Sequence, residues 1–206
     1  MRRHQAAICA AASWASALLA LLPTVAEAHA GGADTGLING LMHPVFGLDH
    51  LLAMISVGVL SVQLGGKNVW RIPAVFVAAM ALGAVLGILD VRLPHTALGI
   101  AGSVLVLGLG IVFAHRRLSP WPITALVSFF GMCHGHAHGV EIPNAVSPAL
   151  YTLGFLISTS TLHIFGVLIG DFATMKAWLL KGLRVTGGVV AASGMVFLVR
   201  ALEGRI

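Results

Sequence analysis

The chain has 206 residues, of which 58% are hydrophobic and only 9% are charged, and its mean hydropathy is +0.96. About a quarter of the residues of a soluble domain are charged, so this composition excludes a water-facing globular surface. The formal net charge of +5 does not indicate nucleic-acid binding, because the basic residues stand in short clusters between long apolar runs, as in the loops of a multi-spanning membrane protein.

The first segment predicts a signal peptide covering residues 1–28. Two arginines precede an apolar stretch from about residue 6 to residue 22, and Ala26-Glu27-Ala28 places small residues where signal peptidase requires them. The alternative is an uncleaved first transmembrane helix. Cleavage would make His29 the mature N-terminus, outside the cytoplasm, where its amine and imidazole would either chelate a metal together or form a mobile tail.

The rest of the chain predicts an all-α membrane protein with one domain, residues 29–206, built of six transmembrane helices. Each of its apolar runs is long enough to cross a hydrocarbon core of about 30 Å. Short connections with glycine, proline or aspartate separate these runs. The predicted spans are residues 37–64, 69–89, 95–114, 121–141, 148–170 and 179–201.

The basic residues predict the orientation of these spans in a bacterial inner membrane. A cleaved signal peptide places the mature N-terminus in the periplasm, and the loops alternate from there. The inner segments then hold seven lysines and arginines and the outer segments three, as the positive-inside rule requires. They are Lys67, Arg71, Arg116, Arg117, Lys176, Lys181 and Arg184 inside, and Arg92, Arg200 and Arg205 outside.

The first span contains ionisable residues, which are costly in a bilayer and mark an ion or proton path. His43, Gly47, His50 and Met54 follow one another at steps of four, three and four, which places them on one face of a continuous helix. Gly47 would leave space on this face for an ion or for another backbone. Asp49 lies off the stripe by about a third of a turn, from where it would ligate a metal directly or accept a hydrogen bond from an imidazole.

The fourth span contains a second cluster of ionisable residues. His134, His138 and Glu141 share a helix face, whereas His136 points roughly the other way. The glycines between the histidines are expected to thin the helix where the ligands gather. Imidazole combined with carboxylate suits nickel, cobalt, zinc or copper far better than magnesium or calcium.

The predicted topology brings the two clusters together. The first span runs inward and the fourth runs outward, so both clusters fall in the outer half of the membrane, with His50 the deepest of them. His163 of the fifth span lies roughly 20 Å from the outer surface and extends the predicted series of metal ligands inward. Hydrogen bonding of His163 to neighbouring hydroxyl groups is the alternative, and Met54 suits core packing as well as ligation.

Two stretches resemble the motifs of the HupE/UreJ family of nickel permeases. His43-Pro44 through Asp49-His50 to Met54 resembles the first-helix motif, and the text from Phe130-Gly131 to Glu141 and Pro143 resembles the second. The likeness extends over essentially the whole mature chain. It departs from the family pattern at His136, where relatives often have another residue, and at Thr96-Ala97, where many relatives carry an acid.

The resemblance implies six helices, a cleaved signal peptide and uptake of nickel, sometimes cobalt, for hydrogenase or urease maturation. It implies a permease and not an enzyme, with no permanently bound cofactor. The expected partners are the divalent metal ion, the lipid bilayer and cytoplasmic maturation proteins for nickel enzymes. The residues carried over as metal-handling are His43, Asp49, His50, His134, His138 and Glu141, with His29, Met54, His136 and His163 as secondary candidates.

Other functions remain open at this point. The histidines of two helices would also serve as axial ligands of a haem, or as a proton path in a membrane subunit. An intramembrane metalloprotease is disfavoured because no H-E-x-x-H sequence is present. No nucleotide-binding motif is present either, so transport would be driven by a gradient, the membrane potential or a coupled ion.

Overall fold

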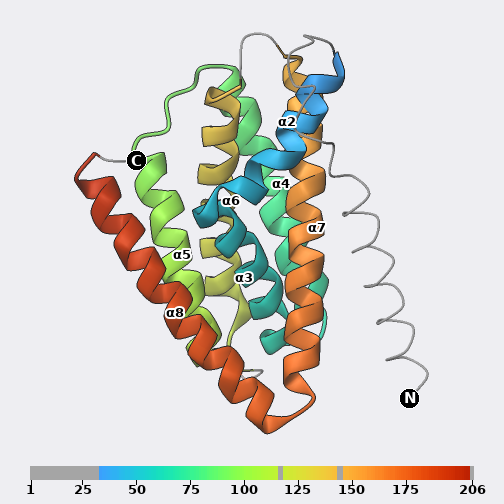
Figure 1. Ribbon diagram of the computed structural model, residues 1–206, viewed down its shortest axis with the longest axis vertical. Coiled ribbons are helices and arrows are strands. Elements are labelled where there is room, and N and C mark those ends of the chain that lie inside the picture. The colour runs from blue at the N-terminus through green and yellow to red at the C-terminus, as the bar shows by residue number, and fades with distance from the viewer. Residues whose placement is uncertain (1–32, 116–117, 143–145, 205–206) are drawn as a thin grey trace.

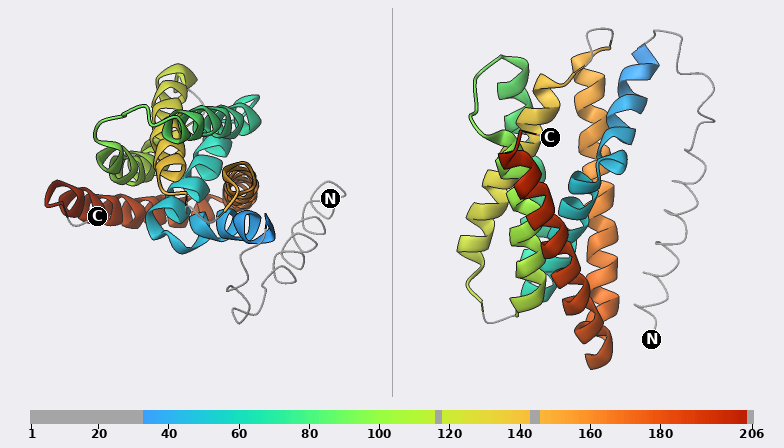
Figure 2. Two further views of the ribbon diagram at one scale, coloured as in Figure 1. Left: turned by 90° about the horizontal axis from the view of Figure 1, so that it is seen from above. Right: turned by 60° about the vertical axis from the view of Figure 1, so that its left-hand side comes forward.

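The computed structural model describes residues 33–115, 118–142 and 146–204, and within these ranges the chain is helical with no strand. Figure 1 and Figure 2 show the helices running roughly side by side in one bundle. The predicted signal peptide and His29 lie outside the described residues. The all-α prediction is confirmed for the part of the chain that the structure covers.

Seven helices are described. Five of the predicted spans correspond to single helices, with boundaries that differ from the expected ones by a few residues only. Prolines occupy the first turns of the helices that begin at residues 120 and 148, where a missing N–H costs no hydrogen bond. In chain order the helices are α2 (Ala33–Phe46), α3 (Leu48–Leu64), α4 (Asn68–Ile88), α5 (Thr96–Phe113), α6 (Pro120–Val140), α7 (Pro148–Thr174) and α8 (Ala177–Leu202).

The first predicted span is not one continuous helix. Residues 37–64 divide into α2 and α3, whose axes are bent by 80° at Gly47. Gly47 has extended backbone angles (φ −79°, ψ 106°), and Pro44 in the last turn of α2 has no N–H to continue the helical bonding. The predicted stripe along a single helix is therefore wrong, since His43 belongs to α2 and His50 to α3.

The six expected spans are confirmed only in part. Of the described helices, α4, α5, α7 and α8 are long and apolar enough to cross a membrane, and the bent pair α2–α3 brings the total to five. α6 is not among them, because its three histidines interrupt an otherwise apolar sequence. These helices are those of a multi-pass membrane protein. α6 packs along α4.

Glycines allow the helices to approach closely. Gly135 and Gly139 of α6 lie against the backbone carbonyls of Met80 and Ala84 of α4. The two glycines thin α6 as expected, and the space that they leave is filled by the backbone of α4. Equivalent contacts join α2 to α7 at Gly40 and Gly154, α3 to α7 at Gly58 and Gly166, and α5 to α8 at Gly108 and Gly194.

The helices alternate in direction, so the basic connections gather at one end. The start of α2, the α4–α5 connection and the start of α7 lie at the upper end in Figure 1, whereas the α7–α8 connection lies at the lower end. The first turns of α4, α6 and α8, at this lower end, contain the exposed residues Trp70, Trp121 and Trp178. The Arg71 guanidinium lies 4.3 Å from the ring centre of Trp121. Tryptophans with lysines and arginines are typical of a membrane interface.

Candidate metal path

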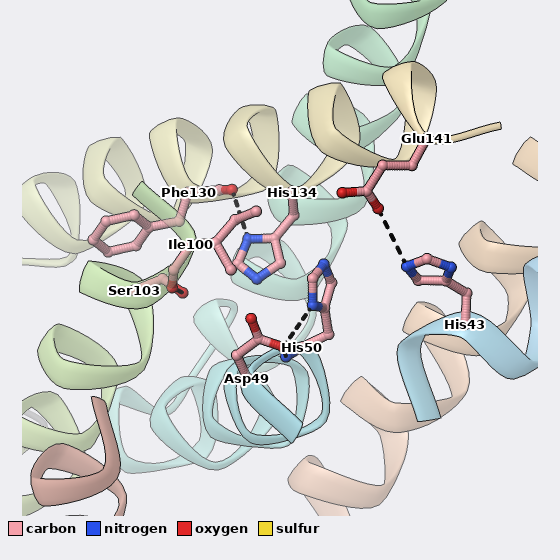
Figure 3. A network of polar contacts seen from close by, with 8 residues as sticks. All are labelled: His43, Asp49, His50, Ile100, Ser103, Phe130, His134 and Glu141. Atoms are coloured by element: carbon pink, nitrogen blue, oxygen red, sulfur yellow. Dashed lines mark hydrogen bonds and ion pairs between the residues drawn. The ribbon is translucent and has the colours of Figure 1, made fainter. Parts of the chain in front are cut away.

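Four histidine rings from three helices meet near the break between α2 and α3. The ring centres of His50 and His134 are 4.8 Å apart, those of His50 and His138 4.9 Å, and those of His43 and His138 4.7 Å. All three contacts are edge to face. The structure thus brings together the histidines predicted from the two motifs, and Figure 3 shows His50 between His134 and the pair formed by His43 and Glu141.

Asp49 fixes the ring of His50. One carboxylate oxygen of Asp49 lies 2.9 Å from His50 Nδ1 and accepts the backbone N–H of His50 at 2.8 Å. A carboxylate oxygen only accepts, so we assign the ring proton to Nδ1 and a lone pair to Nε2. His50 Nε2 is buried and has no hydrogen-bond partner among the described residues. Of the two roles expected for Asp49, the structure therefore shows the hydrogen bond to an imidazole.

His134 and His163 are held in the same way. Nδ1 of His134 lies 3.1 Å from the carbonyl oxygen of Phe130, and Nδ1 of His163 lies 2.7 Å from that of Met54. Each ring thus donates from Nδ1 and keeps the lone pair on Nε2, which is the state in which histidine binds a metal. Both Nε2 atoms are buried without a partner in the described part of the chain.

His43 and Glu141 lie at the outer edge of this cluster. His43 Nε2 is 3.5 Å from a carboxylate oxygen of Glu141, and the two side chains are 34% and 57% exposed. Nδ1 of His43 lies 2.8 Å from the hydroxyl of Tyr151, which comes from α7. This pair is partly exposed, whereas His50, His134 and His138 behind it are buried.

His138 closes the cluster on the side of α7. Its ring stacks on Phe155 with centres 4.5 Å apart, and neither of its nitrogens has a partner within the described ranges. A buried polar atom without a hydrogen bond is costly, so these nitrogens indicate a site for something that binds there.

The remaining candidates lie outside the cluster. His163 does not bond to neighbouring hydroxyls, since its partner is the carbonyl of Met54, and the ring of Phe76 stands between His163 and His134 with centres 5.1 and 5.6 Å away. The Met54 side chain packs in the hydrophobic core. His136 donates from Nε2 to the carbonyl of Val91 in the α4–α5 connection, 2.8 Å away.

Three helix ends add to the electrostatics of the site. His43 lies in the last turn of α2 and His138 in the last turn of α6, and helix C-termini carry partial negative charge that favours a cation. Asp49 lies in the first turn of α3, whose N-terminus favours an anion. A discontinuous helix with its ends at an ion site is common in transporters. Among the described residues, no three histidine, cysteine, aspartate or glutamate side chains already converge on one point as a closed metal site.

Comparison with known proteins identifies the family. The HupE/UreJ protein family matches residues 17–197. Protein HupE of Rhizobium leguminosarum bv. viciae is 42% identical over 181 residues, which cover 86% of this chain and 92% of the relative. The chain belongs to the HupE/UreJ family. No solved structure matches it. The resemblance read from the two motifs is thereby confirmed, and HupE/UreJ proteins are a membrane transport and accessory family associated with nickel uptake for hydrogenase and urease, not a family of enzymes.

Three aromatic residues that contact the histidines of this HupE/UreJ site were not predicted from the sequence. Tyr151 and Phe155 of α7 and Phe76 of α4 contact the histidines through a hydrogen bond, a stacked ring and ring edges. Tyr151 carries a signal that could have found it, because it is the only tyrosine in the sequence and a buried tyrosine needs a partner for its hydroxyl. The two phenylalanines carry none, since they are indistinguishable from core residues.

Proposed function

We propose that this HupE/UreJ protein imports divalent nickel across the bacterial inner membrane, with cobalt as the second candidate substrate. The observation that carries the proposal is the group of four contacting imidazoles beside two carboxylates inside an apolar bundle. Three of these rings have buried nitrogens without a partner among the described residues. Lone pairs of this kind bind transition metals, and the neighbouring carboxylates offset the charge of a divalent ion.

The exposure of the ligands gives an order to the path. A hydrated ion would first meet Glu141 and His43, which water reaches. It would exchange water for the nitrogens of His138 and His50 next, and then for that of His134. His163 would take the ion beyond Phe76, in the inner half of the bundle.

Neighbouring sites that share ligands suit conduction. An ion must be held tightly enough to lose its water and loosely enough to leave. Ring centres less than 5 Å apart allow one ligand to be exchanged before the next is released. The membrane potential contributes about 4.6 kcal/mol per 100 mV for a doubly charged ion that moves to a negative interior.

The proposed orientation places the outer end of the path, at Glu141 and His43, on the periplasmic side; we call this end the mouth. The opposite end carries the exposed tryptophans and described lysines and arginines of the predicted inner loops, as expected for a cytoplasmic interface. In this orientation residues 1–28 serve as a cleaved signal peptide and His29 begins the mature chain in the periplasm. The ion would leave toward cytoplasmic proteins that mature hydrogenase or urease.

A haem site fits the geometry less well. A haem must insert its macrocycle between two axial ligands, whereas these histidine rings touch one another directly. Asp49 and Glu141 also suit a hydrated cation better than a porphyrin. A proton path along the rings would remain compatible with the contacts, and metal accumulation distinguishes it from nickel transport.

Metal accumulation in cells tests the proposal. Cells that express the chain are expected to accumulate nickel above cells that lack it, with a smaller gain for cobalt and the smallest for zinc. The measurement is the metal content of washed cells after exposure to each ion at equal low concentration. Equal nickel contents with and without the chain would contradict nickel import.

Gly47→Ala is expected to lower nickel uptake by about three- to tenfold without unfolding the protein. The backbone angles of Gly47 suit alanine, but its Cβ would lie 3.1 Å from His50 Nδ1 and 3.3 Å from Asp49 Oδ1, so this pair must shift by a few tenths of an ångström. Uptake is measured relative to the amount of protein in the membrane. Gly188→Ala, where an added Cβ meets nothing within 4 Å among the described residues, is the control, and equal uptake by both variants would contradict the expectation.

A further inference from the structure

Tyr151 contacts the histidine cluster, but the proposed path gives its hydroxyl no role. It lies in the first turns of α7 and is fully buried, and its hydroxyl reaches His43 Nδ1 at 2.8 Å. Its ring also contacts that of His43, with centres 6.0 Å apart. Tyr151 therefore sets both the place of the His43 ring and the hydrogen bonding of its inner nitrogen.

The partner of His43 differs in kind from those of the other histidines. Nδ1 of His50, His134 and His163 faces a carboxylate or a backbone carbonyl, which can only accept a hydrogen bond. Those three rings are thus fixed with the proton on Nδ1. A tyrosine hydroxyl can both donate and accept, so Tyr151 leaves both neutral forms of His43 open.

Glu141 determines which neutral tautomer His43 adopts when no metal is bound. Its carboxylate lies 3.5 Å from His43 Nε2, and its negative charge favours an N–H at that nitrogen. We therefore assign the ring proton of the metal-free form to Nε2, and in this form Tyr151 donates to Nδ1. A cation can bind His43 Nε2 only through a lone pair. Binding therefore requires a proton to arrive at Nδ1 and another to leave Nε2, which keeps the charge of the ring unchanged.

We propose that Tyr151 is a positioning residue that lets His43 alternate between presenting an N–H to the Glu141 carboxylate and ligating the incoming divalent cation. In the ligating form Nδ1–H donates to the Tyr151 oxygen, and the protons exchange with water, which reaches the partly exposed His43. Once the ion has moved on to His138, the ring regains its proton on Nε2. It then presents an N–H toward the mouth and opposes return of the ion. This inference rests on the proposed function.

Tyr151→Phe tests the role in transport because it removes only the hydroxyl. The half-saturating nickel concentration for uptake is expected to rise by about three- to tenfold, as for one lost hydrogen bond, while the maximal rate stays within about twofold. Thr152→Val removes a neighbouring buried hydroxyl of α7 that has no partner in the described structure, and it is expected to change neither quantity. A half-saturating concentration equal to that of Thr152→Val, or a fall in the maximal rate alone, would overturn the proposal.

Nitrogen NMR of purified protein with ¹⁵N-labelled histidine tests the alternation itself. His43, assigned by the signals lost in His43→Gln, is expected to carry its proton on Nε2 without metal and on Nδ1 with bound Zn²⁺, a diamagnetic probe. A proton on Nδ1 in both states would overturn the proposal. This readout does not depend on transport: absence of nickel uptake by wild-type cells would contradict the proposed function, whereas the nitrogen shifts would still decide the role of Tyr151.

Discussion

Replacing His50 by alanine is expected to reduce nickel accumulation by at least about tenfold, toward the level of cells that lack the chain. The His50 ring contacts those of His43, His134 and His138. Its removal interrupts the path at its centre and leaves Asp49 without the ring that it orients. Glu141→Ala is expected to have a similarly large effect, because it removes the carboxylate at the mouth.

Accumulation is measured together with the amount of each variant in the membrane, so that loss of transport is separated from loss of protein. Leu60→Ala is the matched control for His50→Ala. Leu60 is a buried residue of the same helix that packs in the hydrophobic core, so its truncation also opens a cavity but removes no metal ligand. Wild-type accumulation in both His50→Ala and Glu141→Ala would contradict the assignment of these residues to the path.

The sequence was sufficient to predict the helices and the meeting of the two motifs. Helical spacing places His134, His138 and Glu141 on one face, and the alternation of spans brings that face near His43 and His50. These predictions depend on hydrophobicity and periodicity, which are local properties of a sequence. The six spans are confirmed only in part, since α6 is too rich in histidine to meet the length and hydropathy criteria that α4, α5, α7 and α8 meet.

The break at Gly47 could not be placed from the sequence. Helical spacing assumes a continuous helix and so put His43 and His50 on one stripe. The two rings are near each other for a different reason, because α2 turns by 80° relative to α3 and both rings then face α6. The roles of Tyr151 and Met54 also depend on which helix lies opposite, which is a tertiary property.

Gly135 shows the same limit in the packing of α6, because the sequence indicated that it thins the helix but not that α4 is the helix packed against it. The Cβ of an alanine at this position would overlap the carbonyl oxygen of Met80, which is backbone and cannot rotate away. The two helices would have to separate, and the adjacent His134 would move with α6. The site therefore depends on a helix contact on the opposite side of α6.

Gly135→Ala is accordingly expected to lower the midpoint of thermal unfolding in detergent by about 5–10 °C, as for a core overpacked at the cost of a few kcal/mol. Nickel uptake per folded molecule should fall as well, because His134 is displaced from His50. Gly102→Ala is the control, since an added Cβ there meets nothing within 4 Å and alanine favours the helix. If Gly135→Ala kept the midpoint and uptake of Gly102→Ala, the close contact between α4 and α6 would not hold the histidines in place. A lower midpoint with full uptake would show that the contact stabilises the bundle without aligning His134.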